Sequence, residues 1–437
     1  MTVGEGFAPP EIPLKNKVNY MRYGLLGEKL PHSFSKEIHE KLGRYTYELI
    51  EVEKENFAAF AEARDFTAIN VTIPYKCDIM PYLATISEQA ENIGAVNVVL
   101  NKGGTLHGYN TDFAGLSNLI LRAGFDLKGK TVLILGYGGT SKTAYAVCRD
   151  LGAETVKFVK RKADDKVISY ADAARGYAHA DYIINTTPCG MYPHTAETPF
   201  DGSGVSLADF PELKGVVDVI YNPLRTRLMN EAQLAGIPAE NGLYMLVSQA
   251  TEAAEIFTGE AVPAEVTEKI YKELALAKQN IVLTGMPGCG KSTVGAILAE
   301  KTGRSFYDTD EEFTKKYGTP ADYIRAHGES AFRDAESEVI AELCRETVGS
   351  IISTGGGAVL RHENVLALRG NGKVYFIDRD IDDIIPTSDR PLSSDREMLE
   401  KRYAERYPIY TGTCDVCIKN DGTAEALAAK IIADFEK

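Results

Sequence analysis

The nonapeptide GMPGCGKST at residues 285–293 sets the first limit on the fold of this chain. It matches G-x-x-x-x-G-K-[ST] in full, follows the apolar run NIVLT and opens the helical pattern TVGAILAEKTG. A strand, a glycine loop and a helix in this order form a phosphate cradle. We therefore predict a nucleoside triphosphate site in which Lys291 neutralises the outer phosphates and Ser292 binds Mg²⁺. The nucleotide-binding residues are Gly285, Pro287, Gly288, Cys289, Gly290, Lys291, Ser292 and Thr293.

The residues after this loop indicate what receives the phosphate. FYDTDEEF ends a predicted strand with Asp308 and Asp310, and a spacing of two places both carboxylates on one face of the strand. One carboxylate could reach the Mg²⁺ shell and the other a substrate hydroxyl. Three arginines and a run of bare glycine backbone favour a pocket for a small carboxylated polyol. These residues are Arg333, Arg390, Arg406, Gly355, Gly356 and Gly357. The N-K-x-D motif by which a GTPase reads its base is absent from the sequence.

A second glycine turn lies far upstream, in VLILGYGGTSKTAYAV. Gly136, Gly138, Gly139 and Thr140 stand between a buried strand and a helix, which is the context of a dinucleotide site. The third glycine of the usual pattern is missing, so an ordinary strand-to-helix turn stays an alternative. The next strand, TVKFVKRK, ends in three cations, Lys160, Arg161 and Lys162. They favour NADP over NAD because they suit a 2′-phosphate, although a solvated basic strand end would look the same.

The segment before this turn carries polar residues where a core would need apolar ones. Lys76 in NVTIPYK and Asp112 in GYNTDFAG could form a pair that shares a proton. A carbonyl reduced by hydride needs one proton at its developing alkoxide, and such a pair could supply it. Ser33, Ser35 and Asn97 could hold a small polyhydroxy acid. Taken singly, each of these residues also fits a surface or turn role.

Taken in order, eight motifs over about residues 20–275 resemble shikimate dehydrogenase. They are HSFS, NVTIPYK, GAVN, YNTD, GYGGTSKT, NTTPCGM, DVIYNP and NGLYMLVSQA. The resemblance implies NADPH-dependent reduction of 3-dehydroshikimate to shikimate, with Lys76 and Asp112 as the catalytic pair. It also implies that Ser33, Ser35, Thr72, Asn97 and Gln249 hold the substrate, with Tyr221 close by, and that Gly242 contacts the cofactor. The family's Asn-Arg-Thr after the second strand is Lys160-Arg161-Lys162 here, so only the arginine is kept.

Residues 279–437 resemble shikimate kinase in the same way, through GMPGCGKST, FYDTDEEF, AFRDAE, STGGGAV, SDRPL and AERYPIY. This resemblance implies transfer of the ATP γ-phosphate to the 3-hydroxyl of shikimate. The implied substrate residues are Asp310, Arg333, Gly355, Gly356 and Arg406. Lys291 and Arg390 would stabilise the moving phosphoryl group, Ser292 and Asp308 would serve Mg²⁺, and Asp310 would orient or deprotonate the hydroxyl. The predicted lid, DIDDIIPTSDRPLSSDREML, is shorter and more acidic than usual in the family.

These patterns together predict an α/β chain with a leader and three domains. A leader at 1–19 precedes an α/β substrate domain at 20–110, to which 240–275 returns. A Rossmann-type NADP domain occupies 111–239, and a P-loop kinase domain with a parallel sheet occupies 279–437. The helical stretch EVTEKIYKELALAKQ has no obvious partner face, so we expect it to end the first part and to lead into a short linker.

Composition limits the partners and the compartment. A formal net charge of −14 disfavours nucleic acid, whose phosphates need an excess of Lys and Arg. No stretch approaches the roughly 18 apolar residues of a membrane span, and no signal peptide is visible. Seven scattered cysteines are typical of a reduced, cytoplasmic protein. The oligomeric state cannot be predicted from these features.

The function predicted from the sequence is bifunctional, with NADP(H), ATP and Mg²⁺ as cofactors and small-molecule substrates. Three alternatives stay open at this point. The first part could be a quinate/shikimate dehydrogenase of broader specificity. One part could be catalytically inactive and regulatory. A P-loop signalling switch tethered to a sensor domain would need the base-reading motif that is absent.

Overall fold

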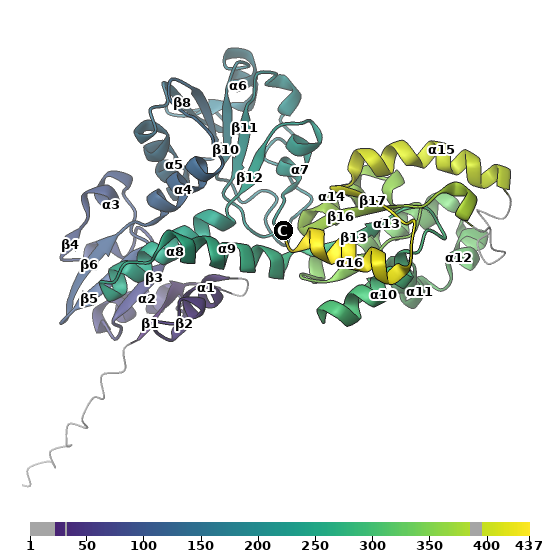
Figure 1. Ribbon diagram of the computed structural model, residues 1–437. Helices are drawn as coiled ribbons and strands as arrows, with labels where there is room; N and C mark the ends of the chain where they lie inside the picture. Colours follow the sequence, from purple (N-terminus) through teal and green to yellow (C-terminus); the bar gives the residue numbers. More distant parts are fainter. Residues whose placement is uncertain (1–21, 31–32, 385–395) are drawn as a thin grey trace, which may run out of the picture.

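The computed structural model describes residues 22–30, 33–384 and 396–437, and within these ranges the strands form three β-sheets. Figure 1 shows the first two sheets in the N-terminal part of the chain (residues 22–278) and the third in the C-terminal part (residues 280–437). The predicted α/β class is confirmed. The predicted leader and Arg390 lie outside the described residues.

The first sheet is mixed, with the strand order β2-β1-β3-β5-β6-β4. Its central strands β1 and β3 are buried along their whole length and are parallel to each other, whereas β5 pairs antiparallel with both β3 and β6. Continuous apolar runs such as YGLLG suit strands that are covered on both faces. The strands are β1 (Tyr23–Gly27), β2 (Tyr47–Glu51), β3 (Ala68–Val71), β4 (Thr85–Ile86), β5 (Val98–Lys102) and β6 (Thr105–Tyr109). The helices are α1 (Ser35–Leu42), α2 (Lys54–Ala63), the 3₁₀ turn η1 (Met80–Tyr82) and α3 (Glu88–Ile93).

The second sheet is parallel throughout, with the order β12-β11-β10-β7-β8-β9. The chain starts at the central strand β7, builds β8 and β9 on one side and then crosses to β10 on the other. This reversal creates the crevice at which open parallel sheets bind nucleotides, directly after β7. The strands are β7 (Thr131–Leu135), β8 (Thr155–Lys160), β9 (Ile168–Ser169), β10 (Tyr182–Asn185), β11 (Gly215–Asp218) and β12 (Ala239–Asn241). The helices are α4 (Asp112–Arg122), α5 (Gly139–Asp150), α6 (Tyr170–Gly176), η2 (Leu207–Asp209) and α7 (Arg227–Leu234).

Two helices then return from the second sheet to the first, α8 (Leu243–Thr258) and α9 (Ala264–Lys278). On α8, Ala253 and Phe257 pack with Tyr23 and Leu25 of β1. On α9, Ile270 and Leu274 are buried in the cluster that contains Ile38 of α1. The expectation that this last helix has no partner face is therefore wrong. Its apolar residues are too few to stand out in the sequence, but their spacing of four places them on one side of the helix.

The third sheet is also parallel, with the order β14-β15-β13-β16-β17. Its central strand β13 is buried at every position and leads into the phosphate loop. The strands are β13 (Asn280–Thr284), β14 (Phe306–Asp308), β15 (Ile351–Ser353), β16 (Gly372–Asp378) and β17 (Val416–Lys419). The helices are α10 (Lys291–Thr302), α11 (Thr309–Tyr317), α12 (Pro320–His327), α13 (Glu329–Glu346), η3 (Ala358–Leu360), α14 (His362–Asn371), η4 (Ile381–Asp383), α15 (Arg396–Thr413) and α16 (Ala424–Phe435).

The short linker between the two parts is a single residue. Helix α9 ends at Lys278 and β13 begins at Asn280, so only Gln279 separates them. Arg304 of the C-terminal part donates hydrogen bonds to the carbonyl oxygens of Gln279 and Leu276, at 2.7 and 2.8 Å. These bonds satisfy carbonyls that the end of a helix leaves without intrahelical partners. The C-terminal part thus caps the last helix of the N-terminal part.

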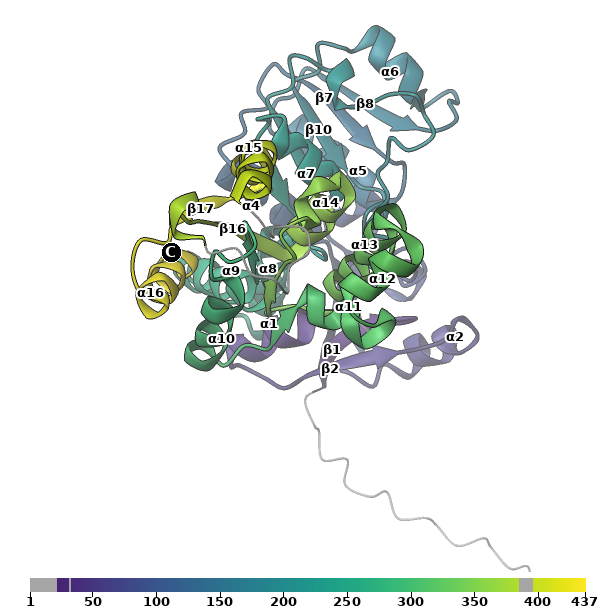
Figure 2. The ribbon, with the colours of Figure 1, turned by 90° about the vertical axis from the view of Figure 1, so that its right-hand side faces the viewer.

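A buried ionic cluster joins the two parts a second time, where α7 lies beside α14 in both ribbon views (Figures 1 and 2). Arg225 binds both carboxylate oxygens of Asp415, at 2.8 and 3.0 Å, and Arg369 lies 3.2 Å from the same group. Arg369 also donates to the side-chain oxygen of Asn230 at 3.2 Å. The three charged side chains are only 11%, 6% and 20% exposed for Arg225, Arg369 and Asp415. This cluster, Arg225–Asp415–Arg369, fixes α7 against the third sheet.

Replacing Asp415 with Ala should destabilise the protein, because it leaves two buried arginines without a counter-charge. Breaking a buried ion pair from one side costs about 3–5 kcal/mol, and partial exposure of Asp415 reduces the expected loss to about 2–4 kcal/mol. Urea unfolding followed by circular dichroism would measure it. The matched control is Asp421→Ala, because Asp421 pairs with Lys430 on the exposed surface, at 3.3 Å. That variant should change stability by less than about 1 kcal/mol.

The contribution of this cluster to the stability of the protein should depend on pH. Burial on its own would raise the pKa of Asp415, but the hydrogen bond from Arg225 and the charges of Arg225 and Arg369 hold that pKa below its usual value. A depressed carboxyl pKa stabilises the fold above the unfolded value of about 3.9 and loses this effect as the pH falls below it. The stability gap between the wild type and Asp415→Asn should therefore narrow below about pH 4. A difference in stability between the two proteins that is the same at all pH values would contradict the role of Asp415 as a charged partner.

Candidate active sites

In the N-terminal part, the predicted pair Lys76 and Asp112 is in direct contact. The Lys76 Nζ atom donates to Oδ2 of Asp112 at 2.5 Å, and Asn97 Nδ2 donates to the other carboxylate oxygen at 2.9 Å. Lys76 follows the end of β3, Asn97 precedes β5, and Asp112 is the first residue of α4. An ionised carboxylate only accepts hydrogen bonds, so both oxygens of Asp112 are matched to donors. Three residues chosen from separate motifs are thus brought together at one place.

Thr111 extends this group, and sequence reasoning did not single it out. Its hydroxyl accepts from Asn97 Nδ2 at 3.1 Å and lies 3.4 Å from Oε1 of Gln249, while its backbone N–H donates to Asn97 Oδ1 at 2.8 Å. The predicted residue Gln249 on α8 is therefore connected to the Lys76–Asp112 pair. Thr111 stands in the quoted motif YNTD beside Asp112, which was the available signal.

The predicted serines lie at the start of α1. The hydroxyl of Ser33 accepts a hydrogen bond from the backbone N–H of Ser35 at 3.2 Å, and Ser35 itself is buried. Between them, the ring of Phe34 lies 5.2 Å from the ring of Tyr221, so that Tyr221 is next to the serine segment. Thr72 follows β3, where its backbone N–H donates to Leu26 of β1 at 2.9 Å.

A half-buried carboxyl, Glu252, lies one helical turn beyond Gln249 on α8. Burial raises its pKa to about 7, and the negative charges of Glu255 and Asp112 act in the same direction. A raised carboxyl pKa stabilises the fold fully below the unfolded value of about 4.3, and this effect is lost as the pH rises through 7. At pH 8 the folded protein must hold an additional charge in this region.

Glu252→Gln should therefore be more stable than the wild type at pH 8, by about 2 kcal/mol after allowance for partial exposure. The difference should shrink as the pH falls and disappear near pH 4, where the side chain is protonated in both the folded and the unfolded chain. Urea unfolding at both pH values measures this. Glu265→Gln, an exposed position on α9, is the control and should show no pH-dependent difference. A Glu252→Gln variant no more stable than the wild type at pH 8 would contradict the prediction.

The first glycine turn connects β7 to α5. Gly136 has a φ of +111°, and a Cβ atom there would lie 2.8 Å from the hydroxyl oxygen of Thr186, so a side chain is disfavoured twice. By contrast, Cβ atoms at Gly138 and Gly139 would meet no atom within 4 Å. The N-terminus of α5, with Thr140 as its second residue, is therefore open to an approaching anion.

The residue that stands near the missing third glycine is Ser141. It is buried, accepts a hydrogen bond from the Gly138 N–H at 3.0 Å and contacts the Thr186 hydroxyl at 2.7 Å. A side chain that holds the turn from within can replace a glycine at this point. At the end of β8, Lys160 pairs with Asp164 at 2.5 Å, whereas Arg161 and Lys162 are exposed. Gly242 comes directly before α8 and donates to the carbonyl of Ile220 at 3.0 Å.

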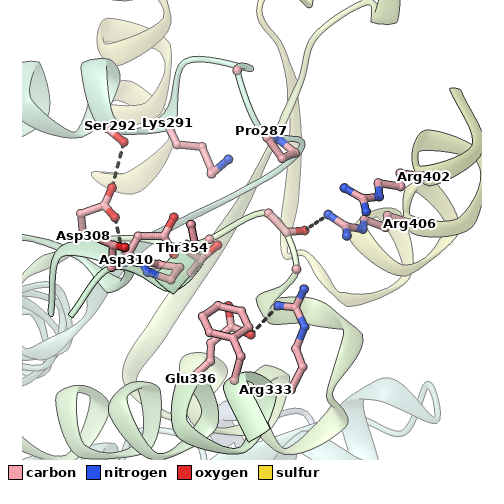
Figure 3. Close-up of a pocket in the computed structure, with 18 of the residues that line it drawn as sticks. Pro287, Lys291, Ser292, Asp308, Asp310, Arg333, Glu336, Thr354, Arg402 and Arg406 are labelled. Atoms are coloured by element: carbon pink, nitrogen blue, oxygen red, sulfur yellow. Dashed lines mark hydrogen bonds and ion pairs between the residues drawn. The ribbon is translucent and has the colours of Figure 1, made fainter. Parts of the chain in front are cut away.

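In the C-terminal part, the phosphate loop borders a cavity of about 670 Å³, a size typical of small-ligand sites (Figure 3). The Lys291 Nζ atom donates to the carbonyl oxygens of Gly285 and Met286, at 2.8 and 2.9 Å. Cys289 is buried beneath the loop, 3.8 Å from the same Nζ atom. The predicted loop residues that line the cavity are Pro287, Gly288, Gly290, Lys291, Ser292 and Thr293.

Asp308 and Asp310 both line this cavity, but not for the reason expected from the sequence. Strand β14 ends at Asp308, and Asp310 belongs to helix α11, so the prediction that they share a strand face is wrong. Asp308 caps the helix instead, since its Oδ1 accepts from the Asp310 N–H at 3.0 Å. Its other oxygen accepts from the Ser292 hydroxyl at 2.8 Å. Ser292 and Asp308 thus present oxygen atoms of the kind that Mg²⁺ prefers.

The opposite wall of the cavity is the glycine run with two predicted arginines. A Cβ atom at Gly355 would lie 2.6 Å from Oδ1 of Asp310, so the bare backbone lets that carboxylate approach. Arg406 of α15 donates to the carbonyl oxygen of Gly356 at 2.9 Å. Arg333 pairs at 2.7 Å with Glu336, a buried lining residue that the sequence did not indicate.

The described helices include none that is long and apolar enough to cross a membrane. Among the described residues, three or more His, Cys, Asp or Glu side chains nowhere gather as metal ligands.

Comparison with protein-family models gives two matches. The model of the shikimate dehydrogenase substrate binding domain matches residues 25–99, and the shikimate kinase model matches residues 287–436. Among curated proteins, the shikimate dehydrogenase (NADP(+)) of Clostridium perfringens (strain SM101) is 36% identical over 269 residues, which are 58% of this chain and 97% of the relative. The protein of the same name from Methanococcus maripaludis (strain C7) is 36% identical over 260 residues, 54% of this chain and 90% of the relative.

Two solved structures resemble the same portion of the chain. A chorismate mutase/shikimate 5-dehydrogenase fusion protein from Clostridium acetobutylicum is 34% identical, with a TM-score of 0.55, and covers 59% of this chain and 98% of its own. A shikimate 5-dehydrogenase from Thermus thermophilus, solved in complex with NADP(H) and shikimate, is 29% identical, with a TM-score of 0.51. It covers 58% of this chain and 99% of its own.

Proposed function

This chain belongs to the shikimate dehydrogenase family and continues into a shikimate kinase domain, and on this basis we propose how its residues carry out two consecutive reactions. It is a bifunctional enzyme of the shikimate pathway. The dehydrogenase part (residues 22–278) reduces 3-dehydroshikimate with NADPH, and the kinase part (residues 280–437) phosphorylates shikimate with ATP. We propose the same domain division as the sequence predicts, 20–110 with 240–275, 111–239 and 279–437.

In the reduction, NADPH bound at the glycine turn would supply the hydride. Lys76 donates a proton from Nζ to the oxygen of the carbonyl as the hydride reaches its carbon, and Lys76 then regains a proton from solvent. Asp112 orients the ammonium group through their 2.5 Å contact. Asn97 and Thr111 are joined to each other by two hydrogen bonds. This pair keeps the carboxylate of Asp112 in place, because Asn97 also donates to it.

The substrate ring of the dehydrogenase would be held by hydroxyl and amide groups around this pair. We assign this role to Ser33, Ser35, Thr72, Asn97, Tyr221 and Gln249. Two contacts support the assignment, because each joins segments that are far apart in the sequence: Tyr221 lies next to Phe34, between the two serines, and Gln249 is linked through Thr111 to the Lys76–Asp112 pair.

The NADP site fits the residues at the turn after β7. Open space at Gly138 and Gly139 and the free end of α5 suit a pyrophosphate, with Gly136, Thr140 and Gly242 completing the cradle. We assign the 2′-phosphate to Lys160, Arg161 and Lys162. Lys160 is already paired with Asp164, so the two exposed neighbours are the better placed of the three.

In the phosphorylation, Asp310 orients or deprotonates the 3-hydroxyl of shikimate. Lys291 leaves the carbonyls of Gly285 and Met286 and binds the phosphates, where its charge stabilises the moving phosphoryl group. Ser292 and Asp308 would hold Mg²⁺, which neutralises phosphate charge. Arg333, Arg406, Gly355 and Gly356 would hold the substrate. The assignment of Arg390 to the phosphoryl group rests on the sequence motif alone.

The observation that carries this proposal is that each part brings its own reacting groups together. Lys76 and Asp112 are in contact in one part, and Lys291, Ser292 and Asp308 line one cavity in the other. The direct test is a coupled assay of the full chain with 3-dehydroshikimate, NADPH and Mg·ATP. We expect oxidation of NADPH and accumulation of shikimate 3-phosphate, detected by mass spectrometry. A chain that consumed neither cosubstrate would refute both activities.

A further inference from the structure

A third arginine, Arg402, lines the kinase cavity beside those assigned to the substrate. It lies one helical turn before Arg406 on α15, so the two side chains are on the same face of the helix. Figure 3 shows both guanidinium groups extending from α15 in the same direction, toward the glycine run, with Arg333 reaching it from below. Three guanidinium groups from two helices therefore converge on one wall.

Among the residues that line the cavity, cationic side chains outnumber carboxylates. Five cationic side chains line the cavity, Lys291, Arg333, Arg379, Arg402 and Arg406, against three carboxylates, Asp308, Asp310 and Glu336. Arg333 pairs with Glu336 at 2.7 Å and with Glu329 at 3.5 Å, while the two aspartates lie near the phosphate loop. Arg406 donates to the carbonyl of Gly356, which carries no charge. Both residues that α15 contributes to the lining, Arg402 and Arg406, are thus arginines.

The guanidinium groups on this wall also influence one another. Burial lowers the pKa of Arg402, and the positive charges of Arg406 and, less strongly, Arg333 act in the same direction, while Glu329 and Glu405 act in the opposite direction. Like charges spaced four residues apart on a helix also repel each other. A bound carboxylate would relieve the repulsion and accept charge-assisted hydrogen bonds in the planar geometry that arginine offers.

The two ends of the cavity match a molecule with a hydroxyl group at one end and a carboxylate at the other. Lys291, Ser292, Asp308 and Asp310 lie on one side in Figure 3, and Arg402 and Arg406 on the other. We propose that Arg402 is a further substrate-recognition residue of the kinase, which binds the carboxylate of the cyclic polyol acid together with Arg406 and Arg333. This inference rests on the proposed kinase function.

The experiment compares shikimate with its methyl ester, which has the same ring and hydroxyls but no carboxylate charge. In the full chain, Arg402→Met should raise KM for shikimate about 10- to 100-fold, the loss expected for a hydrogen bond between charged groups. The kcat and the KM for ATP should stay within about twofold. KM for the ester should hardly change, so the preference for the acid over the ester collapses. Arg402→Lys, which keeps the charge but not the planar fork, should restore part of the preference.

Lys401→Met is the matched control, since it removes a positive charge from the adjacent, exposed position of α15. It should leave both KM values unchanged. Dehydrogenase activity in each preparation confirms that the chain is folded. An unchanged KM for shikimate in Arg402→Met, or an equal rise for acid and ester, overturns the inference and leaves the kinase function intact. Failure of the unmodified chain to phosphorylate shikimate would instead overturn the kinase function, and this inference with it.

Discussion

Lys76→Met should lower the turnover of 3-dehydroshikimate about 10²–10⁴-fold, the usual contribution of a positioned proton donor. The hydride can still be delivered, but the alkoxide then takes its proton from water. Lys76 is the group in contact with Asp112, at 2.5 Å, and methionine keeps its length without the ammonium. Oxidation of NADPH followed by absorbance measures the loss. Phosphorylation of shikimate by the same preparation should proceed at the wild-type rate, because Lys76 lies after β3 of the first sheet and does not line the kinase cavity.

The control for this variant is Lys102→Met, an exposed lysine at the end of β5. It removes the same charge from the same domain and should retain full reductase activity. Asp112→Asn keeps the size of the side chain but weakens the orientation of Lys76, so we expect a smaller loss than for Lys76→Met. Normal reductase turnover in Lys76→Met would remove this lysine from the mechanism.

The parts of the molecule that the sequence predicted well are those in which local order determines the structure. A strand, a glycine turn and a helix occupy consecutive residues in both nucleotide sites, so the pattern in the sequence is already the pattern in space. The Lys76–Asp112 contact joins residues 36 positions apart. It was predicted because each residue lies in a motif, and the order of the motifs resembles a known family.

The prediction failed where a boundary or a distant contact decides the outcome. The spacing of Asp308 and Asp310 looked like a strand face, but the capping of α11 by Asp308 ends the strand earlier. The Arg225–Asp415–Arg369 cluster joins residues up to 190 positions apart, so no local sequence pattern could predict it. Asp415 even lies in CDVC, where the two cysteines attract attention and the aspartate does not. Glu336 and Thr111 were missed because the role of a buried polar residue can be recognised only when its hydrogen-bond partners in the fold are known.

The connection between the two parts has a consequence for interpreting variants. The capping of α9 by Arg304 and the cluster around Asp415 both lie outside the residues assigned to either reaction. A substitution in one site should therefore affect one activity, whereas a substitution in the connection should affect the stability of the whole chain. Measuring both activities in every variant separates these two classes.

Lys291→Met should give the opposite selectivity to Lys76→Met. Loss of one preorganised charge that stabilises a transition state costs about 10²–10³ in kcat, and Lys291 is the charged residue of the phosphate loop. Its methylene chain is buried, so methionine preserves the packing while the bonds to Gly285 and Met286 are lost. Formation of shikimate 3-phosphate from shikimate and Mg·ATP measures the effect. The reductase in the same preparation should be unaffected.

Lys301→Met is the matched control, because Lys301 is an exposed lysine on the same helix, α10. A kinase rate in Lys301→Met equal to that of the wild type would show that loss of charge from this helix is harmless in itself. The informative case is a Lys291→Met chain that accumulates shikimate from 3-dehydroshikimate and NADPH without converting it further. That result would show that the two reactions take place at separate sites of one folded molecule, because one site would form shikimate and the other would fail to phosphorylate it. A Lys291→Met chain that still formed shikimate 3-phosphate at the wild-type rate would mean that the loop holds the nucleotide without contributing charge to the transfer.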